Sequence, residues 1–311
     1  MGSSGQPVTQ SASPAYTFVV YPRHEKDIEA YVPRVAQSAL EDLYLIGEIT
    51  PGVIGESGRI ITLSYTADML DLLGEDEWRH LFRRIQGFAG TEWIALAGRL
   101  PALAIGNGVR IEPPFVLGDK GTIYTVTANL EQLCLASSLS LEETRIAVIG
   151  QGYIGSRVVR RLQGFGYPNL VGFDPRFRSS YNRRGVYYTG DPNELRNCDV
   201  GIALTAQGSD LARFIPFLKE GVRILDDTHP EIPLELRTRI RAERGGQIFK
   251  AVLGLEGVYF RPAFPEFQEE WIMGCVTETL ARVIGYSLQT QGESDRTFRG
   301  LGFKARCPLM Q

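Results

Sequence analysis

The sequence has no long apolar run, no closely spaced pair of cysteines and little net charge. No stretch approaches the roughly 18 apolar residues that cross a bilayer, and the first residues lack the basic and apolar regions of a signal peptide. The four cysteines and three histidines show no zinc-type spacing, so we expect free thiols, no metal site and a cytoplasmic protein. A net charge of -3 gives no electrostatic reason to expect nucleic acid as a partner.

The first third of the chain mixes two hydrophobic periodicities. Alternating or fully apolar runs predict strands, and apolar residues spaced three or four apart predict helices. We predict a hairpin around the polar turn Gly55–Gly58, and a break at Gly74 in a longer helix. The predicted elements are a strand at 16–20, a helix at 25–43, hairpin strands at 45–54 and 59–65, a helix at 69–88 and a strand at 93–97.

From Arg145 onward, short apolar strands alternate strictly with helices. Strands that are apolar on both faces indicate a parallel sheet covered on both sides, so the predicted class is α/β and doubly wound. The predicted strands are 146–149, 170–173, 200–204, 222–225 and 248–253, and the predicted helices are 154–162, 193–196, 210–218 and 234–242. A further helix, at 266–286, is expected to return across the cleft to the first domain.

A glycine motif, Gly150-Gln151-Gly152-Tyr153-Ile154-Gly155, follows the first of these strands and opens a helix. In this context the first glycine permits a tight turn, the second lets a pyrophosphate approach the backbone, and the third lets helix and strand pack closely. The free N–H groups of the helix start face the phosphates. We therefore predict dinucleotide binding by Gly150, Gly152, Tyr153, Ile154 and Gly155.

Asp174 ends the second strand, nineteen positions after Gly155, where an acid binds the ribose hydroxyls of a dinucleotide. A carboxylate there repels a 2′-phosphate and favours NAD. Arg176 and Arg178 follow at once, and guanidinium groups can hold a 2′-phosphate, so NADP stays open. We predict that Asp174 and Arg176 bind a nicotinamide cofactor, NAD being slightly favoured over NADP.

These features divide the chain into parts. The start is rich in Ser, Gly, Gln and Pro, a composition typical of disorder. The predicted parts are a disordered leader at 1–14, an N-terminal α/β substrate domain at 15–117, an interdomain helix at 118–140, a Rossmann dinucleotide-binding domain at 141–258, and a C-terminal helix and tail at 259–311.

Five segments, in order between Ile46 and Ile284, are similar to motifs of one enzyme family. They are Gly58–Tyr65 with Asp68–Leu70, Ile94–Gly98, Gly118–Thr125, Ile224–Pro230 and Met273–Leu280. Through them the chain resembles the cyanobacterial long-chain acyl-(acyl-carrier-protein) reductases. The resemblance implies that Cys275 carries an acyl group and that a reduced nicotinamide releases it as an aldehyde. The implied substrate is an acyl thioester on a carrier protein or coenzyme A.

The residues around Cys275 leave its role open. A cysteine in an apolar helix is usually a small core residue, and a helix interior gives a thiolate no support from the helix start. Glu278, three positions on, faces the same side and is either a polar pocket residue or a paired carboxylate.

The chain departs from the family at Gln151, at Asp174 and at Lys120. Lys120 either meets a carboxylate or a developing oxyanion, or lies in solvent. We interpret the departures as an altered substrate, an aminoacyl or other small polar acyl thioester.

His229 follows a predicted strand at the sheet edge where doubly wound folds bind ligands. It is either a proton carrier, with Asp227 orienting its ring, or part of an ordinary turn before Pro230. The predicted catalytic set is Cys275, Lys120, His229 and Glu278.

Two other functions remain open. A non-covalent dehydrogenase or imine reductase resembling shikimate dehydrogenase or ornithine cyclodeaminase-like enzymes would use Lys120, Asp119 or His229 as proton carrier. A non-catalytic nucleotide sensor fits less well, because polar candidates converge on the cleft. No sequence feature specifies an oligomeric state.

Overall fold

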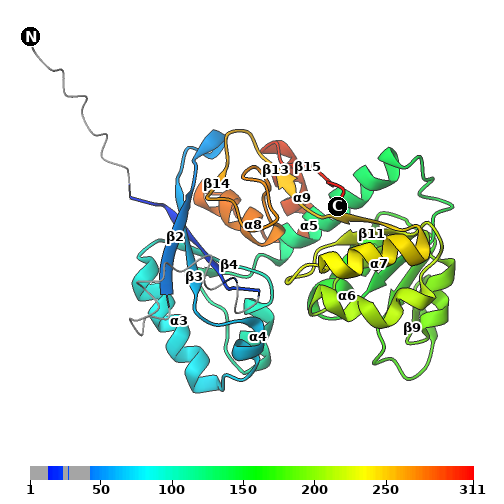
Figure 1. Ribbon diagram of the computed structural model, residues 1–311. Helices are drawn as coiled ribbons and strands as arrows, with labels where there is room; N and C mark the ends of the chain where they lie inside the picture. Colours follow the sequence, from blue (N-terminus) through cyan, green and yellow to red (C-terminus); the bar gives the residue numbers. More distant parts are fainter. Residues whose placement is uncertain (1–12, 24–26, 28–42) are drawn as a thin grey trace, which may run out of the picture.

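The computed structural model describes residues 13–23, 27 and 43–311, and it contains two mainly parallel sheets joined by long helices (Figure 1). The predicted helix at 25–43 falls almost wholly outside the described residues. Among the described residues, no helix is both long and apolar enough to cross a membrane.

The first sheet has the strand order β14-β2-β3-β1-β4-β5. The central strand β1 pairs in parallel with β3 and β4, and β2 and β3 form the predicted antiparallel hairpin. The bounds are β1 Tyr16–Val20, β2 Leu43–Ile49, β3 Gly58–Leu63, β4 Trp93–Leu96, β5 Phe115–Val116 and β14 Phe260–Arg261. The strand β14 comes from the far end of the chain and was not predicted.

Helices of the first domain cover this sheet. The predicted break at Gly74 is confirmed: α2 spans Ala67–Asp71, and α3 spans Glu75–Ala89 with Gly74 as its N-cap. Trp78 of α3 is fully buried among strand residues and α4, Leu100–Gly106.

The second sheet has the strand order β12-β11-β10-β6-β7-β9-β8, and every pair except β8–β9 is parallel. The bounds are β6 Ile146–Ile149, β7 Leu170–Phe173, β8 Tyr181–Arg183, β9 Val186–Thr189, β10 Val200–Ala203, β11 Arg223–Asp226 and β12 Gln247–Lys250. This arrangement confirms the doubly wound Rossmann fold. The hairpin of β8 and β9 extends the sheet beyond the predicted strands.

The helices of this sheet are α6, Tyr153–Gly164, and α7, Leu234–Arg244. Two predicted α-helices were wrong in type. Residues Pro192–Asn197 (η3) and Gly208–Phe217 (η4) form 3₁₀ helices. Pro216 inside η4 lacks the N–H that a continuing α-helix would use.

Two helices link the halves: α5, Asp119–Ala136, and α8, Gly274–Val283. The predicted helix at 266–286 was wrong at its start, because Ile272 pairs with Leu253 as an antiparallel bridge and keeps the backbone extended up to Met273. The chain ends with α9, Gln291–Gly300, and with β15, Lys304–Ala305, which pairs with β13, Leu253–Gly254.

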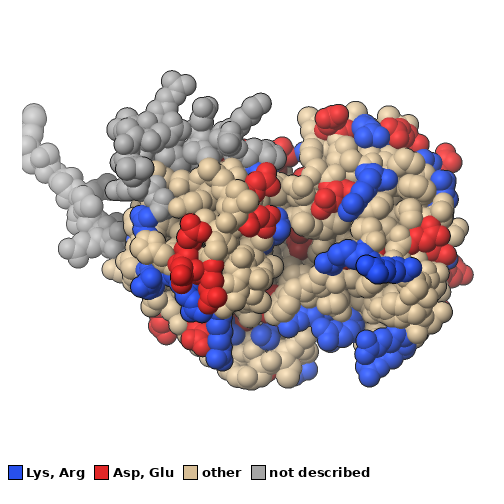
Figure 2. All heavy atoms as spheres, turned by 90° about the horizontal axis from the view of Figure 1, so that it is seen from below, with Lys and Arg blue, Asp and Glu red and all other residues tan. Residues whose placement is uncertain are grey.

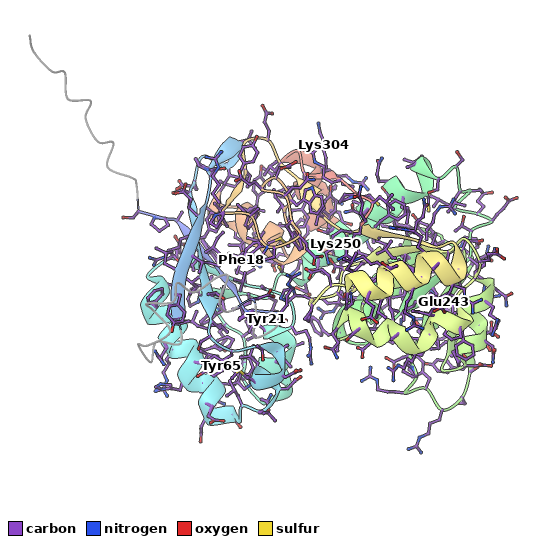
Figure 3. The ribbon with its side chains drawn as sticks, viewed as in Figure 1. Phe18, Tyr21, Tyr65, Glu243, Lys250 and Lys304 are labelled. Atoms are coloured by element: carbon purple, nitrogen blue, oxygen red, sulfur yellow. The ribbon has the colours of Figure 1, made fainter. Side chains whose placement is uncertain are left out.

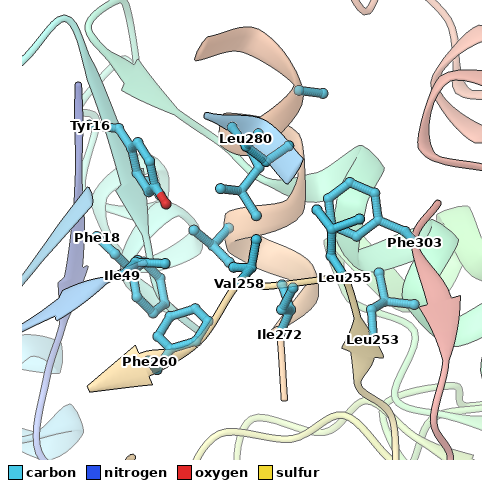
Figure 4. Close-up of a cluster of buried hydrophobic side chains, with 14 of the residues drawn as sticks. Tyr16, Phe18, Ile49, Leu253, Leu255, Val258, Phe260, Ile272, Leu280 and Phe303 are labelled. Atoms are coloured by element: carbon cyan, nitrogen blue, oxygen red, sulfur yellow. The ribbon is translucent and has the colours of Figure 1, made fainter. Parts of the chain in front are cut away.

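The predicted return of the C-terminal helix to the first domain is confirmed. Val276 and Leu280 of α8 are fully buried against the first sheet, close to Tyr16 and Phe18 (Figure 4). Each such side chain contributes roughly 1.5–3 kcal/mol on burial. The start of α8 is thereby fixed at the boundary between the two sheets.

Candidate dinucleotide and substrate site

A cavity of about 840 Å³ lies between the two sheets. Its walls come from the carboxyl ends of the Rossmann strands, the first sheet and the start of α8. Figure 3 shows Phe18 and Tyr21 on the first-domain side and Lys250 on the Rossmann side. In the view of Figure 2, lysine and arginine side chains gather over the Rossmann side of one face.

The glycine turn forms one end of the cavity. Gly150 has a φ of +99°, and a Cβ there would lie 2.6 Å from the Leu204 carbonyl oxygen. A Cβ on Gly155 would overlap the Gly150 carbonyl oxygen, whereas a Cβ on Gly152 would meet nothing within 4 Å. Gly152 also caps α6 without any side-chain hydrogen bond. The fold of the turn thus requires glycine at positions 150 and 155. The absence of a side chain at Gly152 leaves the start of α6 open, as a bound phosphate would require.

Asp174 and Arg176 line the same end of the cavity. Asp174 accepts hydrogen bonds from the Gln151 N–H at 2.9 Å and from Arg176 Nε at 2.9 Å and Nη2 at 2.8 Å. Burial alone would raise the pKa of this carboxyl, but the hydrogen bonds outweigh burial and lower the pKa to about 2. An ionised carboxylate therefore stands where the adenosine ribose of a dinucleotide would lie. The remaining predicted cofactor residues, Tyr153 and Ile154, also line the cavity.

Cys275 also lines the cavity, as the second residue of α8. The expected helix-interior position was wrong, because α8 begins at Gly274. Burial raises the pKa of the thiol to about 12, and hydrogen bonds from the backbone N–H groups of Gly98, Cys275 and Val276 act in the opposite direction. The thiol is thus neutral at pH 7, while backbone N–H groups of Gly98, Cys275 and Val276 favour its ionised form.

Glycines at the starts of α5 and α8 explain how Cys275 reaches the cavity. A Cβ on Gly121 would overlap the Gly274 carbonyl oxygen, and a Cβ on Gly118 would lie 2.8 Å from the Cys275 Cα. A Cβ on Gly274 would lie 2.6 Å from the Thr122 Cα. The two helix starts therefore touch through backbone, and any side chain at these positions would push Cys275 away.

Lys120 and Glu278 do not line the cavity. Glu278 is almost fully buried, and its Oε1 lies 3.7 Å from Lys120 Nζ and 2.8 Å from Arg282 Nη2. Its Oε2 has no hydrogen-bond partner in the described part of the chain. The structure joins these two predicted catalytic residues to each other at the α5–α8 contact.

His229 lines the cavity next to Cys275. Its ring packs edge-on against Tyr21 at 4.7 Å, and its Nδ1 lies 3.7 Å from Glu231 Oε1. Its Nε2 is buried and has no hydrogen-bond partner among residues 13–23, 27 and 43–311. A Cβ on Gly98 would lie 2.8 Å from His229 Cδ2, so His229 and the N–H group that faces Cys275 are neighbours.

The sequence prediction missed a buried charged group around the end of β11. Lys250 is 4% exposed, and its Nζ lies 3.6 Å from Asp226 Oδ2 and 3.9 Å from Glu231 Oε1. Arg23 Nη1 donates a hydrogen bond to Glu231 Oε2 at 3.3 Å. The available signal was Lys250 itself, a charged residue at the end of an apolar strand.

The pKa values in this group follow from burial and pairing. Burial lowers the pKa of Lys250, but the charges of Asp226 and Glu231 outweigh it and raise the pKa. Burial raises the pKa of Glu231, and Lys250 and His229 reverse that effect, so the pKa is lowered. Asp227 is the exception, because burial raises the pKa of its carboxyl to about 7.

No group of three or more His, Cys, Asp or Glu side chains within the described ranges could hold a metal ion. Cys275, His229, Asp227 and Lys250 are among the polar residues that line the cavity together with the glycine turn.

No protein-family model matches the sequence, and no curated protein sequence matches it. Solved structures that are similar include L-tryptophan dehydrogenase from Nostoc punctiforme. The match covers 93% of this chain and 80% of that chain, with 13% sequence identity and a TM-score of 0.45. Another is the NAD-complexed D-isomer specific 2-hydroxyacid dehydrogenase from Lactobacillus delbrueckii ssp. bulgaricus. That match covers 92% of this chain and 94% of that chain, with 12% sequence identity and a TM-score of 0.36.

A third is a dipicolinate synthase chain from Bacillus halodurans, with 14% identity, 50% of this chain and a TM-score of 0.34. The present protein spans little more than half of that synthase chain, 57% of its length. Matches this distant carry no functional argument. The resemblance to the acyl-(acyl-carrier-protein) reductases remains a prediction.

Proposed function

We propose that this protein is a nicotinamide-dependent oxidoreductase that reduces an acyl thioester to an aldehyde through a thioester on Cys275. The observation that carries the proposal is a single cavity lined by both a dinucleotide-type glycine turn and the Cys275 thiol, whose ionised form backbone N–H groups favour. A cofactor and a covalently held acyl group would meet in that space.

The residues present fit a dinucleotide. The open backbone at Gly152 and the uncapped start of α6 suit its phosphates, and the ionised Asp174 suits its ribose hydroxyls. Asp174 supports NAD, while Arg176, three-quarters exposed, stands beside it and would suit the 2′-phosphate of NADP. When bound, the reduced nicotinamide supplies the hydride that converts the acyl group to an aldehyde.

The chain's own residues supply the acyl transfer. Because the Cys275 thiol is neutral, a neighbouring base must take its proton as the sulfur attacks the carbonyl carbon, and the free Nε2 of His229 is suited to that role. The bond from sulfur to the acyl carbon forms, the bond to the carrier thiol breaks, and the proton leaves with that thiol. The N–H groups at the start of α8 favour the charged sulfur.

The test is acylation without any dinucleotide. Incubation with an acyl-pantetheine thioester is expected to add one acyl mass to the wild-type protein and none to Cys275→Ala. Cys307→Ala is the matched control, because burial raises the pKa of that thiol to about 12 too, and it does not line the cavity. Unimpaired reductase activity in Cys275→Ala would sink the covalent mechanism.

One observation favours a second candidate, a dehydrogenase or imine reductase without a covalent intermediate. His229 has a buried, unpartnered Nε2 and a carboxylate neighbour in Glu231, the arrangement of a proton carrier that acts on a substrate oxygen or nitrogen. In that case His229→Gln would abolish activity and Cys275→Ala would retain it.

A further inference from the structure

We propose that Asp227 is the binding site for a substrate ammonium group, so that the acyl group carried by Cys275 is an aminoacyl group. This inference rests on the proposed function and names its substrate class. Asp227 follows β11 and lines the cavity together with Cys275 and His229.

The acidic side chains next to Asp227 already have hydrogen-bond or ion-pair partners within the protein. Asp226 Oδ1 accepts hydrogen bonds from Thr228 N at 2.8 Å and Oγ1 at 2.6 Å, and its Oδ2 accepts from Ile232 N at 3.1 Å. Glu231 lies between Arg23 and Lys250. The Asp227 carboxyl, in contrast, makes no hydrogen bond or ion pair with any residue that the structure describes.

The charges around the turn leave a negative excess for a ligand to neutralise. Lys250 pairs with both Asp226 and Glu231. Arg23 pairs with Glu231 and also with Asp27, whose Oδ2 lies 2.9 Å from Arg23 Nε. The charge of Lys250 lowers the pKa of Asp227 in part, but no lysine or arginine of the described residues lies within ion-pair distance of its carboxyl. Burial raises the pKa of this carboxyl to about 7, because the ionised form loses solvation in the cavity wall. A ligand ammonium would supply the missing partner.

The position of Asp227 suits an α-amino group. Asp227 and Cys275 line the same cavity, and the charge of Asp227 raises the pKa of the Cys275 thiol. In an aminoacyl thioester the nitrogen is two bonds from the carbonyl carbon, and it lies within roughly 3–4 Å of the sulfur. A carboxylate in the wall of this cavity is therefore placed to receive that nitrogen.

The rest of the cavity indicates the side chain of the aminoacyl group. Its first-domain and C-terminal walls carry apolar and aromatic side chains, including Phe18, Phe264, Phe267 and Met273. Phe18 and Phe264 pack edge-to-face, with ring centroids 6.2 Å apart. An apolar or aromatic side chain fits this wall, while the ammonium group faces Asp227.

A binding experiment tests the inference without requiring any reaction. In the Cys275→Ala protein, calorimetry would compare phenylalaninol with 3-phenylpropanol, which lacks the amino group. We expect phenylalaninol to bind at least about 10-fold more tightly, and Asp227→Asn to remove that preference while changing 3-phenylpropanol affinity by less than about 2-fold. Asp210→Asn, an acid that lines the cavity elsewhere, is the control and should keep the preference.

A kinetic experiment compares the rates at which Cys275 is acylated by thioesters with and without the amino group. Wild-type protein should be acylated at least about 10-fold faster by phenylalanyl-pantetheine than by 3-phenylpropionyl-pantetheine, and Asp227→Asn should slow only the former. Equal binding of the two alcohols overturns the inference, as does an equal slowing of both thioesters, which would make Asp227 a proton carrier. A preference for phenylalaninol without any acylation of Cys275 would support the ammonium site and overturn the thioester mechanism.

Discussion

Replacing Asp227 with asparagine should make the ligand-free protein more stable. Burial raises the pKa of this carboxyl from its ordinary value of 3.8 to about 7, and no described side chain pairs with it. Each tenfold change in an ionisation equilibrium corresponds to about 1.4 kcal/mol, so holding the charge in the folded state at pH 8 costs about 4 kcal/mol as an upper bound. Asparagine keeps the shape of the side chain and removes the charge.

The difference in the free energy of unfolding between Asp227→Asn and the wild-type protein should grow as pH rises. Because the folded pKa is raised, the unfolded chain releases its proton near pH 4 and the folded chain only near pH 7. The stability of the wild-type protein relative to Asp227→Asn therefore falls as pH rises between these values and then levels off. The gap in the free energy of unfolding is expected to be at most about 2 kcal/mol at pH 5 and at most about 4 kcal/mol at pH 8.

Urea denaturation of both proteins at pH 5 and pH 8 measures this gap. Asp226→Asn is the control: the Asp226 carboxylate accepts three hydrogen bonds, so its loss should destabilise the protein at both pH values. If Asp227→Asn proves less stable than wild type by the same amount at both pH values, then Asp227 is paired in solution and the reasoning is refuted.

Three further predictions concern the cofactor turn, the helix contact and the proton carrier. Asp174→Ala should weaken NADH binding, measured by fluorescence titration, by about 10-fold or more and NADPH binding less, since the ribose hydroxyls lose a charged acceptor. Gly121→Ala should lower the free energy of unfolding by about 1–3 kcal/mol, because its Cβ would overlap backbone of α8. Gly164→Ala, where a Cβ meets nothing within 4 Å, should be neutral or slightly stabilising in the same denaturation assay. His229→Gln should slow acylation of Cys275 at least about 10-fold in a mass-spectrometric time course and leave NADH affinity unchanged.

The Rossmann half could be predicted from sequence because its signals are local. Strands such as Ile146–Ile149 are apolar on both faces, and the glycine motif sits between such a strand and a helix. The hairpin of β2 and β3 and the break at Gly74 were found for the same reason. Each depends on residues that are adjacent in the chain.

The start of α8 and the strand β14 were missed because they depend on contacts between distant segments. The start of α8 is set by the pairing of Ile272 with Leu253. The strand β14 joins the first sheet by antiparallel pairing with β2, a strand far from it in the sequence. The correct placement of Cys275 in the first turn of α8 follows from the pairing of Ile272 with Leu253. No local periodicity reports it.

The candidate site was found in part. Cys275, His229 and the predicted cofactor residues other than Gly155 line one cavity, whereas Lys120 and Glu278 pair with each other outside its lining. Lys250 was missed because its partners Asp226 and Glu231 belong to the neighbouring strand end, and only the parallel sheet brings them together.

The central claim is that an acyl group on Cys275 and a dinucleotide at the glycine turn meet in one cavity. The most direct measurement is a single turnover with isolated acyl-enzyme and NADH or NADPH deuterated at the transferred position of the nicotinamide, followed by mass spectrometry of the released product and of the protein. The account predicts that the acyl mass leaves Cys275 as an aldehyde carrying one deuterium at its carbonyl carbon. An acyl-enzyme that keeps its acyl group, or that releases an acid without deuterium, would contradict it.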